Sequence, residues 1–108
     1  MAEPIARIGN FIHVYDFRVK PGMGDEFIRR FDEFDHSGAN PMHGSPAQVR
    51  EGVLCQDEND PDHFYLIGEW NDKETHRQLL QQLRALEPSF HELIEGGKLV
   101  PIYADVVA

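Results

Sequence analysis

The first patterned segment of the chain alternates apolar and polar side chains, which predicts a β-strand over residues 11–19. One face of this strand is rich in aromatic residues and contains Phe11, His13, Tyr15, Phe17 and Val19. Because successive side chains of a strand point to opposite sides, these five residues would meet a common core. Pro21 and Gly22 then end the strand.

After this turn the apolar spacing changes to that of a helix over residues 24–36, with Phe27, Phe31 and Phe34 on one face. Acidic residues in the first turn suit the positive end of the helix dipole. A Gly/Pro-rich stretch, residues 37–46, follows. Such a segment is typical of an ordinary surface loop or of a lid over a cleft.

Residues 48–56 and the segment DENDPDHFYLIGEW, residues 57–70, predict a β-hairpin. Within it, residues 60–62 have turn chemistry, and the aromatic and branched residues after them favour a pleated, half-buried surface. One face of the later strand holds Phe64, Leu66, Gly68 and Trp70. Gly68 leaves a gap beside Trp70, and such a glycine often marks a close approach by backbone or ligand.

The next helix begins at Lys73, where Asn71 or Asp72 can cap it. Its apolar stripe consists of Leu79, Leu80, Leu83 and Leu86. Pro88 interrupts this helix. A short helical continuation over residues 90–94 and a last strand over residues 99–107 complete the pattern.

The order strand, helix, strand, strand, helix, strand predicts an α+β fold of the ferredoxin-like, split βαβ type. We expect residues 1–108 to form a single domain with an antiparallel sheet and both helices on one face. The opposite sheet face would carry Ile12, Val14, Tyr65 and Ile67. A patch of this kind usually marks an interaction surface, so a homodimer joined sheet to sheet is expected.

Charge and targeting signals narrow the set of partners. The formal net charge of −9 disfavours nucleic acid and anionic membrane surfaces. No signal peptide or membrane-spanning run is recognisable, which favours a cytoplasmic protein. Cys55 is the only cysteine and excludes an internal disulfide; its apolar neighbours predict a small buried residue.

The sequence contains no motif for a metal or a nucleotide cofactor. Its six histidines are scattered, and none form the i, i+4 pair of an HExxH zinc site. Gly22-Met23-Gly24 precedes a helix but lacks the lysine and the spacing of a phosphate loop. We therefore predict no metal site, and neither NAD(P) nor ATP is implied.

Several short motifs together resemble the antibiotic biosynthesis monooxygenase family of dimeric α+β barrels, over about residues 12–95. They are Val19-Lys20-Pro21-Gly22, the phenylalanine-rich helix, DENDPDHFYLIGEW, the helix from Lys73 and Pro88-Ser89-Phe90. The resemblance implies a homodimer whose sheets face each other, with a small cavity between the sheet and helices of each subunit. Members oxidise polyketide-derived phenols to quinones without metal or flavin, degrade haem, process signalling metabolites, or have no assigned reaction. The fold alone does not choose among these activities.

The resemblance also suggests site residues. Trp70 matches the family's tryptophan and is expected in the cavity wall, while His13 is the expected general base. In the second helix, many relatives carry a histidine where this chain has Leu80. His76 lies earlier and Arg84 one turn later; we favour His76, because Leu80 lies on the same helical face. The predicted catalytic residues are His13, Trp70 and His76, and the predicted substrate-binding residues are Tyr15, Phe17, Phe31, Leu80 and Arg84.

The first hypothesis is thus a cofactor-independent monooxygenase acting on an aromatic, polyketide-like metabolite. Haem degradation is disfavoured, because Tyr15 stands where that branch has an asparagine. One alternative is a cyclase or isomerase of the stress-responsive α+β barrel type, to which residues 13–17 bear a weaker likeness. Another is a non-catalytic dimeric module whose interior binds a metabolite or is filled by Phe27, Phe31, Leu79 and Leu83.

Overall fold

A computed structural model describes residues 2–108 and contains the predicted order of elements. The elements are β1 (Phe11–Arg18), α1 (Gly24–Asp35), β2 (Gln48–Asp57), β3 (Asp60–Trp70), α2 (Lys73–Ala85), the short 3-10 helix η1 (Ser89–Leu93) and β4 (Ile102–Asp105). The strands form one antiparallel sheet in the order β2-β3-β1-β4. This arrangement confirms the α+β ferredoxin-like fold.

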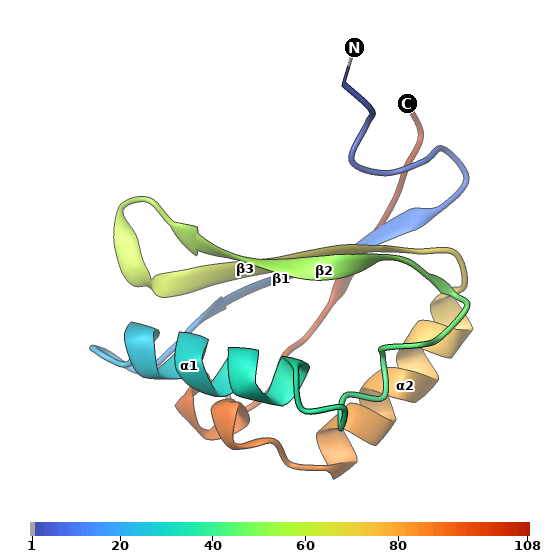
Figure 1. The fold of residues 1–108 in the computed structure, drawn as a ribbon. Coiled ribbons are helices and arrows are strands. Elements are labelled where there is room, and N and C mark those ends of the chain that lie inside the picture. Colours follow the sequence, from blue (N-terminus) through green and yellow to red (C-terminus); the bar gives the residue numbers. More distant parts are fainter. Residues whose placement is uncertain (1) are drawn as a thin grey trace.

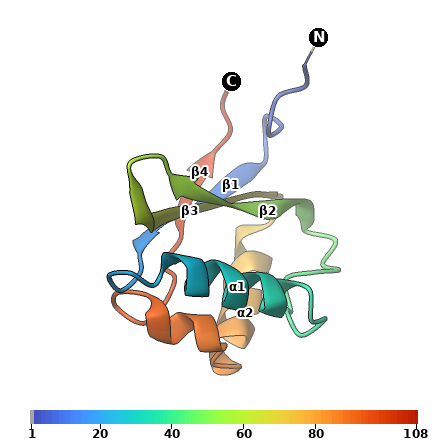
Figure 2. The same ribbon diagram turned by 60° about the vertical axis from the view of Figure 1, so that its left-hand side comes forward.

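Both α-helices and η1 cover the same face of the sheet (Figure 1). The view turned by 60° shows the same two layers (Figure 2). The terminal segments lie on the other side of the sheet, where Glu69 is buried beneath the N-terminal segment. Its Oε2 accepts hydrogen bonds from the Arg7 backbone N–H at 2.9 Å and from Asn10 Nδ2 at 2.8 Å. No helix among residues 2–108 has the length and apolar character needed to cross a membrane.

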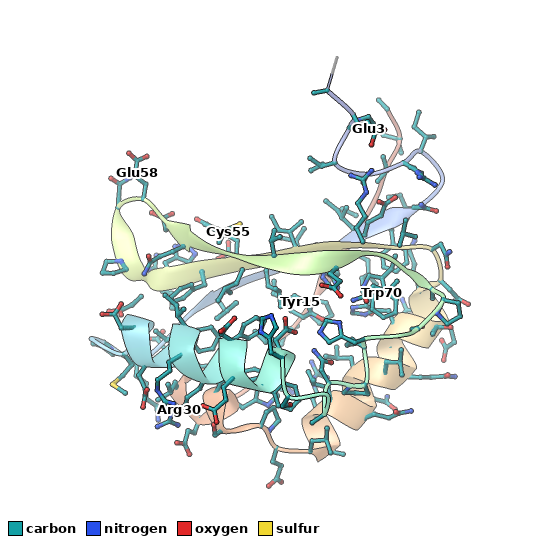
Figure 3. The ribbon with its side chains drawn as sticks, viewed as in Figure 1. Glu3, Tyr15, Arg30, Cys55, Glu58 and Trp70 are labelled. Carbon is teal, nitrogen blue, oxygen red and sulfur yellow. The ribbon has the colours of Figure 1, made fainter. Side chains whose placement is uncertain are left out.

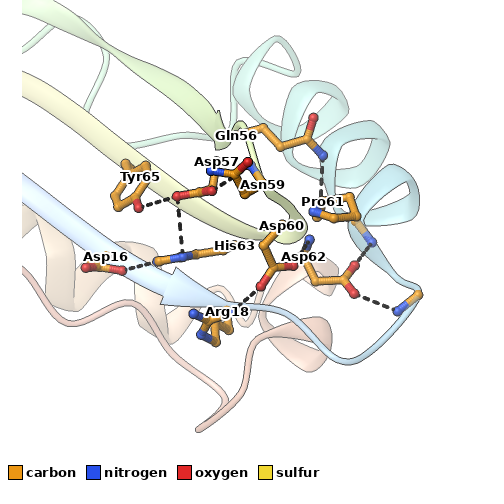
Figure 4. Close-up of polar contacts among 12 residues, drawn as sticks. Asp16, Arg18, Gln56, Asp57, Asn59, Asp60, Pro61, Asp62, His63 and Tyr65 are labelled. Carbon is orange, nitrogen blue, oxygen red and sulfur yellow. Dashed lines mark hydrogen bonds and ion pairs between the residues drawn. The ribbon is translucent and has the colours of Figure 1, made fainter.

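The two helices begin in different ways. At α2, Asp72 is the N-cap, and its side chain accepts from the backbone N–H groups of Glu74 and Thr75. No side chain within α1 caps that helix. Instead, Asp62 of β3 accepts from the backbone N–H groups of Gly22 and Gly24, at 2.9 and 3.0 Å (Figure 4). A carboxylate of the hairpin therefore holds the start of α1 against the sheet.

Two element boundaries differ from the prediction. The hairpin turn lies at residues 58–59, and residues 60–62 open β3 instead of forming the turn. Asp57 already pairs with Asp60, and Pro61 lies beyond the end of β1, so its missing N–H costs no bond to β1. The last strand is shorter than residues 99–107, because β4 pairs only with the four residues 11–14 of β1.

The interior consists of two apolar clusters. The larger one lies between the sheet, α1 and η1 and includes Tyr15, Phe17, Phe27, Phe64, Leu66 and Phe90. The smaller one includes Phe11, Met42, Ala47, Trp70, Leu80 and Leu83. Two buried histidines, His13 and His76, lie among these residues. The ring centre of His13 is 5.0 Å from that of Tyr15 and 6.4 Å from that of Trp70. A buried polar pair is thus placed inside an otherwise apolar core.

The face away from the helices carries an apolar row across all four strands. In register, the row runs from Ile102 through Val14 and Ile67 to Val53. Val53 is 58% exposed and Ile102 is 60% exposed. The prediction of a buried Cys55 was wrong: it is exposed on this side of the sheet (Figure 3), because its neighbour Leu54 alternates inward and packs on the larger cluster.

Candidate active site

A cavity of about 50 Å³ lies between the sheet and the helices. Its apolar wall includes Phe31, Phe34, Leu83 and Phe90. His13 and Tyr15 line it from the sheet, and Asp35, Asn40 and His43 line it from the end of α1 and the loop after it. The cavity is therefore apolar around most of its wall, with convergent polar groups at two places.

The imidazole of His13 lies close to one glycine in each of the two adjacent strands β3 and β2. His13 pairs with Gly68 of β3, and a β-carbon built on Gly68 would lie 2.7 Å from His13 Nε2. A β-carbon on Gly52 of β2 would lie 3.5 Å from the same atom. The gap predicted at Gly68 is therefore filled by the imidazole of His13. Nε2 is left beside Gly52, which also lines the cavity, without a hydrogen-bond partner among the described residues.

The other nitrogen of His13 begins a chain of short polar contacts. His13 Nδ1 lies 2.7 Å from His76 Nε2, and His76 Nδ1 lies 2.6 Å from Tyr103 Oη. The hydroxyl of Tyr15 lies 3.4 Å from His76 Nε2. Tyr15 points from the sheet toward the helices in Figure 3. Side chains from β1, α2 and β4 thus form one hydrogen-bonded group behind the cavity.

Burial sets the charge of these groups. Burial, assisted by the neighbouring His76, lowers the pKa of His13 to about 3. Burial, assisted by the positive Arg77, lowers the pKa of His76 to about 4. Burial also raises the pKa of Tyr15 and the pKa of Tyr103. At neutral pH the group therefore consists of neutral imidazoles and neutral phenols, able both to donate and to accept protons.

Trp70 is fully buried behind the histidine pair. Its indole meets the ring of His76 edge to face, with the ring centres 4.8 Å apart, and lies 6.4 Å from the ring centre of His13. Its Nε1 has no hydrogen-bond partner among the described residues. Trp70 is not among the residues that line the cavity, so the expectation that it forms part of the cavity wall is not met; it packs against the histidines instead.

Of the remaining predicted site residues, only some line the cavity. Phe31 lines the cavity, whereas Phe17 packs on Phe27 and Phe64 in the larger cluster. Leu80 is buried in the smaller cluster with Trp70, and the Nη2 of Arg84 donates to the backbone carbonyl of Leu99. The structure brings His13, His76, Trp70 and Tyr15 together. Their roles in catalysis, and those of the substrate-binding residues, stay predictions.

Two features of the site were missed by the sequence reasoning. Tyr103 comes from the last strand, and the only signal for it was the alternation of that strand. The second is a polar group at the cavity edge, where Asp35 Oδ1 lies 2.9 Å from His43 Nε2 and accepts from Asn40 Nδ2 at 3.1 Å. His43 belongs to the 37–46 stretch, which the sequence indicated only as a surface loop or a lid. Among residues 2–108, no group of three or more His, Cys, Asp or Glu side chains is arranged to hold a metal ion.

Solved structures share this fold along nearly the whole chain. A variant of SnoaB, a cofactor-independent oxygenase from Streptomyces nogalater, is 20% identical, covers 93% of each chain and has a TM-score of 0.62. A dimeric ferredoxin-like protein from an uncultured marine organism is 13% identical and has a TM-score of 0.69, with 93% of this chain and 90% of that chain covered. A conserved protein from Methanosarcina mazei Go1 is 14% identical and has a TM-score of 0.68, with 91% and 93% covered. At these identities the likeness shows the fold alone.

Sequence comparison gives the family. No curated protein matches the chain. The sequence profile of the antibiotic biosynthesis monooxygenases matches residues 10–87, a span from the start of β1 to just beyond α2 that includes His13, Trp70 and His76. The chain therefore belongs to the antibiotic biosynthesis monooxygenase family.

Proposed function

We propose that the protein is a cofactor-independent monooxygenase that oxidises an electron-rich phenol held beside His13 and Tyr15. The observation that carries the proposal is the Nε2 of His13, a neutral imidazole nitrogen beside the cavity without a hydrogen-bond partner among residues 2–108. An acceptor of this kind can take the proton of a bound hydroxyl group. Membership of the family supports oxygen as the second substrate.

The reaction needs little from the protein beyond a base and a dry pocket. A phenol that loses its proton becomes a phenolate, which can donate an electron to molecular oxygen. Addition of one oxygen atom to the ring and loss of the ring hydrogen convert the phenol and O2 into a quinone and one water. In this scheme His13 removes the proton, the Tyr15 hydroxyl donates a hydrogen bond to the phenolate oxygen, and the phenylalanine wall excludes water.

The size of the cavity places a condition on this proposal. A benzene ring occupies a cavity of about 150 Å³, and the cavity observed here measures about 50 Å³. A ring can enter only if part of the wall moves. Part of the wall is formed by Asn40 and His43, which are half-buried and belong to the connection between α1 and β2. We propose that this connection moves outward when substrate binds.

We also propose that the protein is a homodimer joined through the sheet face away from the helices. The apolar row from Ile102 to Val53 would otherwise face water. The name of one structural neighbour describes a dimeric ferredoxin-like protein, which supports a dimer.

A second function is favoured by the same small cavity. If the wall does not move, the interior has room for water or a very small molecule, and the protein would be a dimeric module without turnover of a ring. The size of the molecules that the cavity admits therefore distinguishes the monooxygenase from the module without turnover.

Oxygen uptake with a panel of phenols tests the proposal. The protein is mixed with 1-naphthol, anthrone and 1,8-dihydroxyanthrone in an oxygen electrode cell, with chelator present and with spontaneous oxidation subtracted. We expect uptake with a polycyclic member and a fall of at least tenfold in the His13→Gln variant, which keeps a polar side chain. Binding of a phenol without oxygen uptake would favour a binding module or an isomerase.

A further inference from the structure

We propose that His13, His76 and Tyr103 form a proton relay that connects the cavity with solvent at the β4 side of the sheet. The inference rests on the proposed function and extends it, because it assigns a positioning and proton-transfer role to Tyr103, which lies outside the cavity lining. The observation behind it is the unbroken chain of contacts, 2.7 Å from His13 Nδ1 to His76 Nε2 and 2.6 Å from His76 Nδ1 to Tyr103 Oη.

The chain has a direction once a phenol binds at His13 Nε2, because each imidazole then uses both of its nitrogens. If His13 Nε2 accepts from a bound phenol, His13 carries its proton on Nδ1 and donates to His76 Nε2. His76 then carries its own proton on Nδ1 and donates to Tyr103 Oη. The hydroxyl hydrogen of Tyr103 remains free for water. All three side chains therefore take compatible tautomers in the state that awaits substrate.

Proton transfer along this chain balances. The phenol O–H bond breaks as a new N–H bond forms at His13 Nε2, and the Nδ1 proton of His13 moves to His76 Nε2. The Nδ1 proton of His76 moves to Tyr103 Oη, whose original proton passes to water. The products are a phenolate in the cavity and a proton in solvent. Formation of water from reduced oxygen later consumes a proton, and its return along the same atoms restores the starting tautomers.

Burial explains why a relay suits this site better than a single base. His13 is 6% exposed and His76 is fully buried, and their low pKa values show that neither holds a positive charge readily. A base that kept the proton would remain as a buried imidazolium beside apolar rings, which is costly. Passing the proton on at once leaves both imidazoles neutral.

The solvent end of the relay is set by β4. Tyr103 pairs with His13 across the two strands and is half-buried. The guanidinium of Arg77, an exposed residue, lies 5.1 Å from the centre of the Tyr103 ring. Its positive charge favours departure of the proton from the hydroxyl group, and the nearby Glu74 opposes it. Phe11 packs on the Tyr103 ring from the protein side, with ring centres 5.1 Å apart, and holds it in place.

The tautomers test the relay without any need for turnover. Two-bond 15N–1H spectra of the full chain report which nitrogen of His13 and of His76 carries the proton. We expect Tyr103→Phe to change the tautomer ratio of His76, because His76 loses a hydrogen-bond partner. The tautomer ratio of His13 should change as well, although His13 is connected to the Tyr103 hydroxyl only through His76. Tyr65→Phe, which removes a hydroxyl bonded to Asp57 on the other side of the sheet, should change neither. An unchanged His13 in the Tyr103→Phe spectrum overturns the relay.

Turnover gives the second readout, with the most active phenol of the oxygen-uptake panel as probe. We expect Tyr103→Phe to lower kcat by about tenfold with KM nearly unchanged, and to reduce the solvent deuterium isotope effect that several moving protons produce in the parent protein. Full activity of Tyr103→Phe would refute the relay while leaving the oxygenase proposal intact. Absence of uptake by the parent protein would refute the oxygenase proposal, and the tautomer spectra would then decide the relay alone.

Discussion

The imidazole of His13 occupies the space that a side chain at Gly68 would need. The two residues are cross-strand partners, and a β-carbon at Gly68 would lie 2.7 Å from His13 Nε2. The glycine in β3 thus makes room for the histidine in β1 at the wall of the cavity. The position of the His13 ring therefore explains why a glycine is present at position 68.

Gly68→Ala should therefore displace His13 and lower stability. The added methyl group also meets the backbone of Gly52 at about the limit of contact, 3.1 Å from its Cα, so relief requires movement of the strand as well as the ring. We expect a loss of about 1–3 kcal/mol in the free energy of unfolding, measured by urea titration.

Gly52→Ala is the matched control, because its β-carbon would meet its neighbours at 3.4–3.5 Å, which is ordinary contact. It should cost clearly less than Gly68→Ala. In a double-mutant cycle, His13→Ala should recover part of the Gly68→Ala loss. Equal losses for the two glycines, or no coupling with His13, would contradict this packing.

The buried histidines predict that stability falls on mild acidification. In the unfolded chain a histidine titrates near pH 6.5, whereas folding lowers the pKa of His13 to about 3 and that of His76 to about 4. Below pH 6.5 the unfolded state therefore binds protons that the folded state does not. The contribution of these two histidines to the free energy of unfolding is fully present above pH 6.5 and should decrease toward pH 4, by at most about 1.4 kcal/mol per pH unit for each histidine.

Urea titrations between pH 7.5 and pH 5 measure this slope. His13→Gln should reduce the slope by removing one of the groups, while His91, whose pKa burial also lowers, continues to contribute. The exposed His36 acts in the opposite direction, because its hydrogen bond to the Asp32 carbonyl and the Asp32 charge raise its pKa. His36→Gln should thus steepen the loss. Stability that is flat from pH 7.5 to pH 5 would show that the histidines are charged or accessible.

Much of the fold was predictable because its signals are local. Alternation in β1 placed His13, Tyr15 and Phe17 on the core side, and the capping chemistry of Asp72 marked the start of α2. The strand order followed from the succession of elements. The errors occurred where contacts beyond the local segment decide the outcome: β4 begins only at Ile102, after Pro101, and pairs with residues 11–14 of β1, and Cys55 faces outward because Leu54 faces the core.

The site was predictable only in part, because its contacts join distant parts of the chain. His13 and His76 were proposed separately, and no spacing in the sequence shows that their nitrogens lie 2.7 Å apart. Tyr103 completes the group from a strand whose position beside β1 is known only from the folded sheet. The chemistry of each side chain could be read from its type, but which atoms meet depends on the packing of α2 and β4.

Asp62 should contribute to stability more than its partial exposure suggests. Its two carboxylate oxygens each accept one backbone N–H, from Gly22 and Gly24, where α1 begins without a side-chain cap of its own. Charge-assisted hydrogen bonds of this kind lead us to expect a loss of about 1–3 kcal/mol for Asp62→Ala in urea unfolding. Glu58→Ala, at the exposed tip of the same hairpin, should have almost no effect, and equal losses for the two variants would argue against the contact.

Ile67→Asp should disrupt the proposed homodimer. Ile67 lies at the middle of the apolar row, with Val14 on one side and Val53 on the other, so a carboxylate there would be buried without a partner between two sheets. We expect the mass measured by light scattering after size exclusion to fall from that of two chains to that of one. Leu86→Asp, an exposed apolar position at the end of α2, should leave the mass unchanged. A dimer that persists in Ile67→Asp would place the interface elsewhere, and a parent protein with the mass of one chain would refute the dimer.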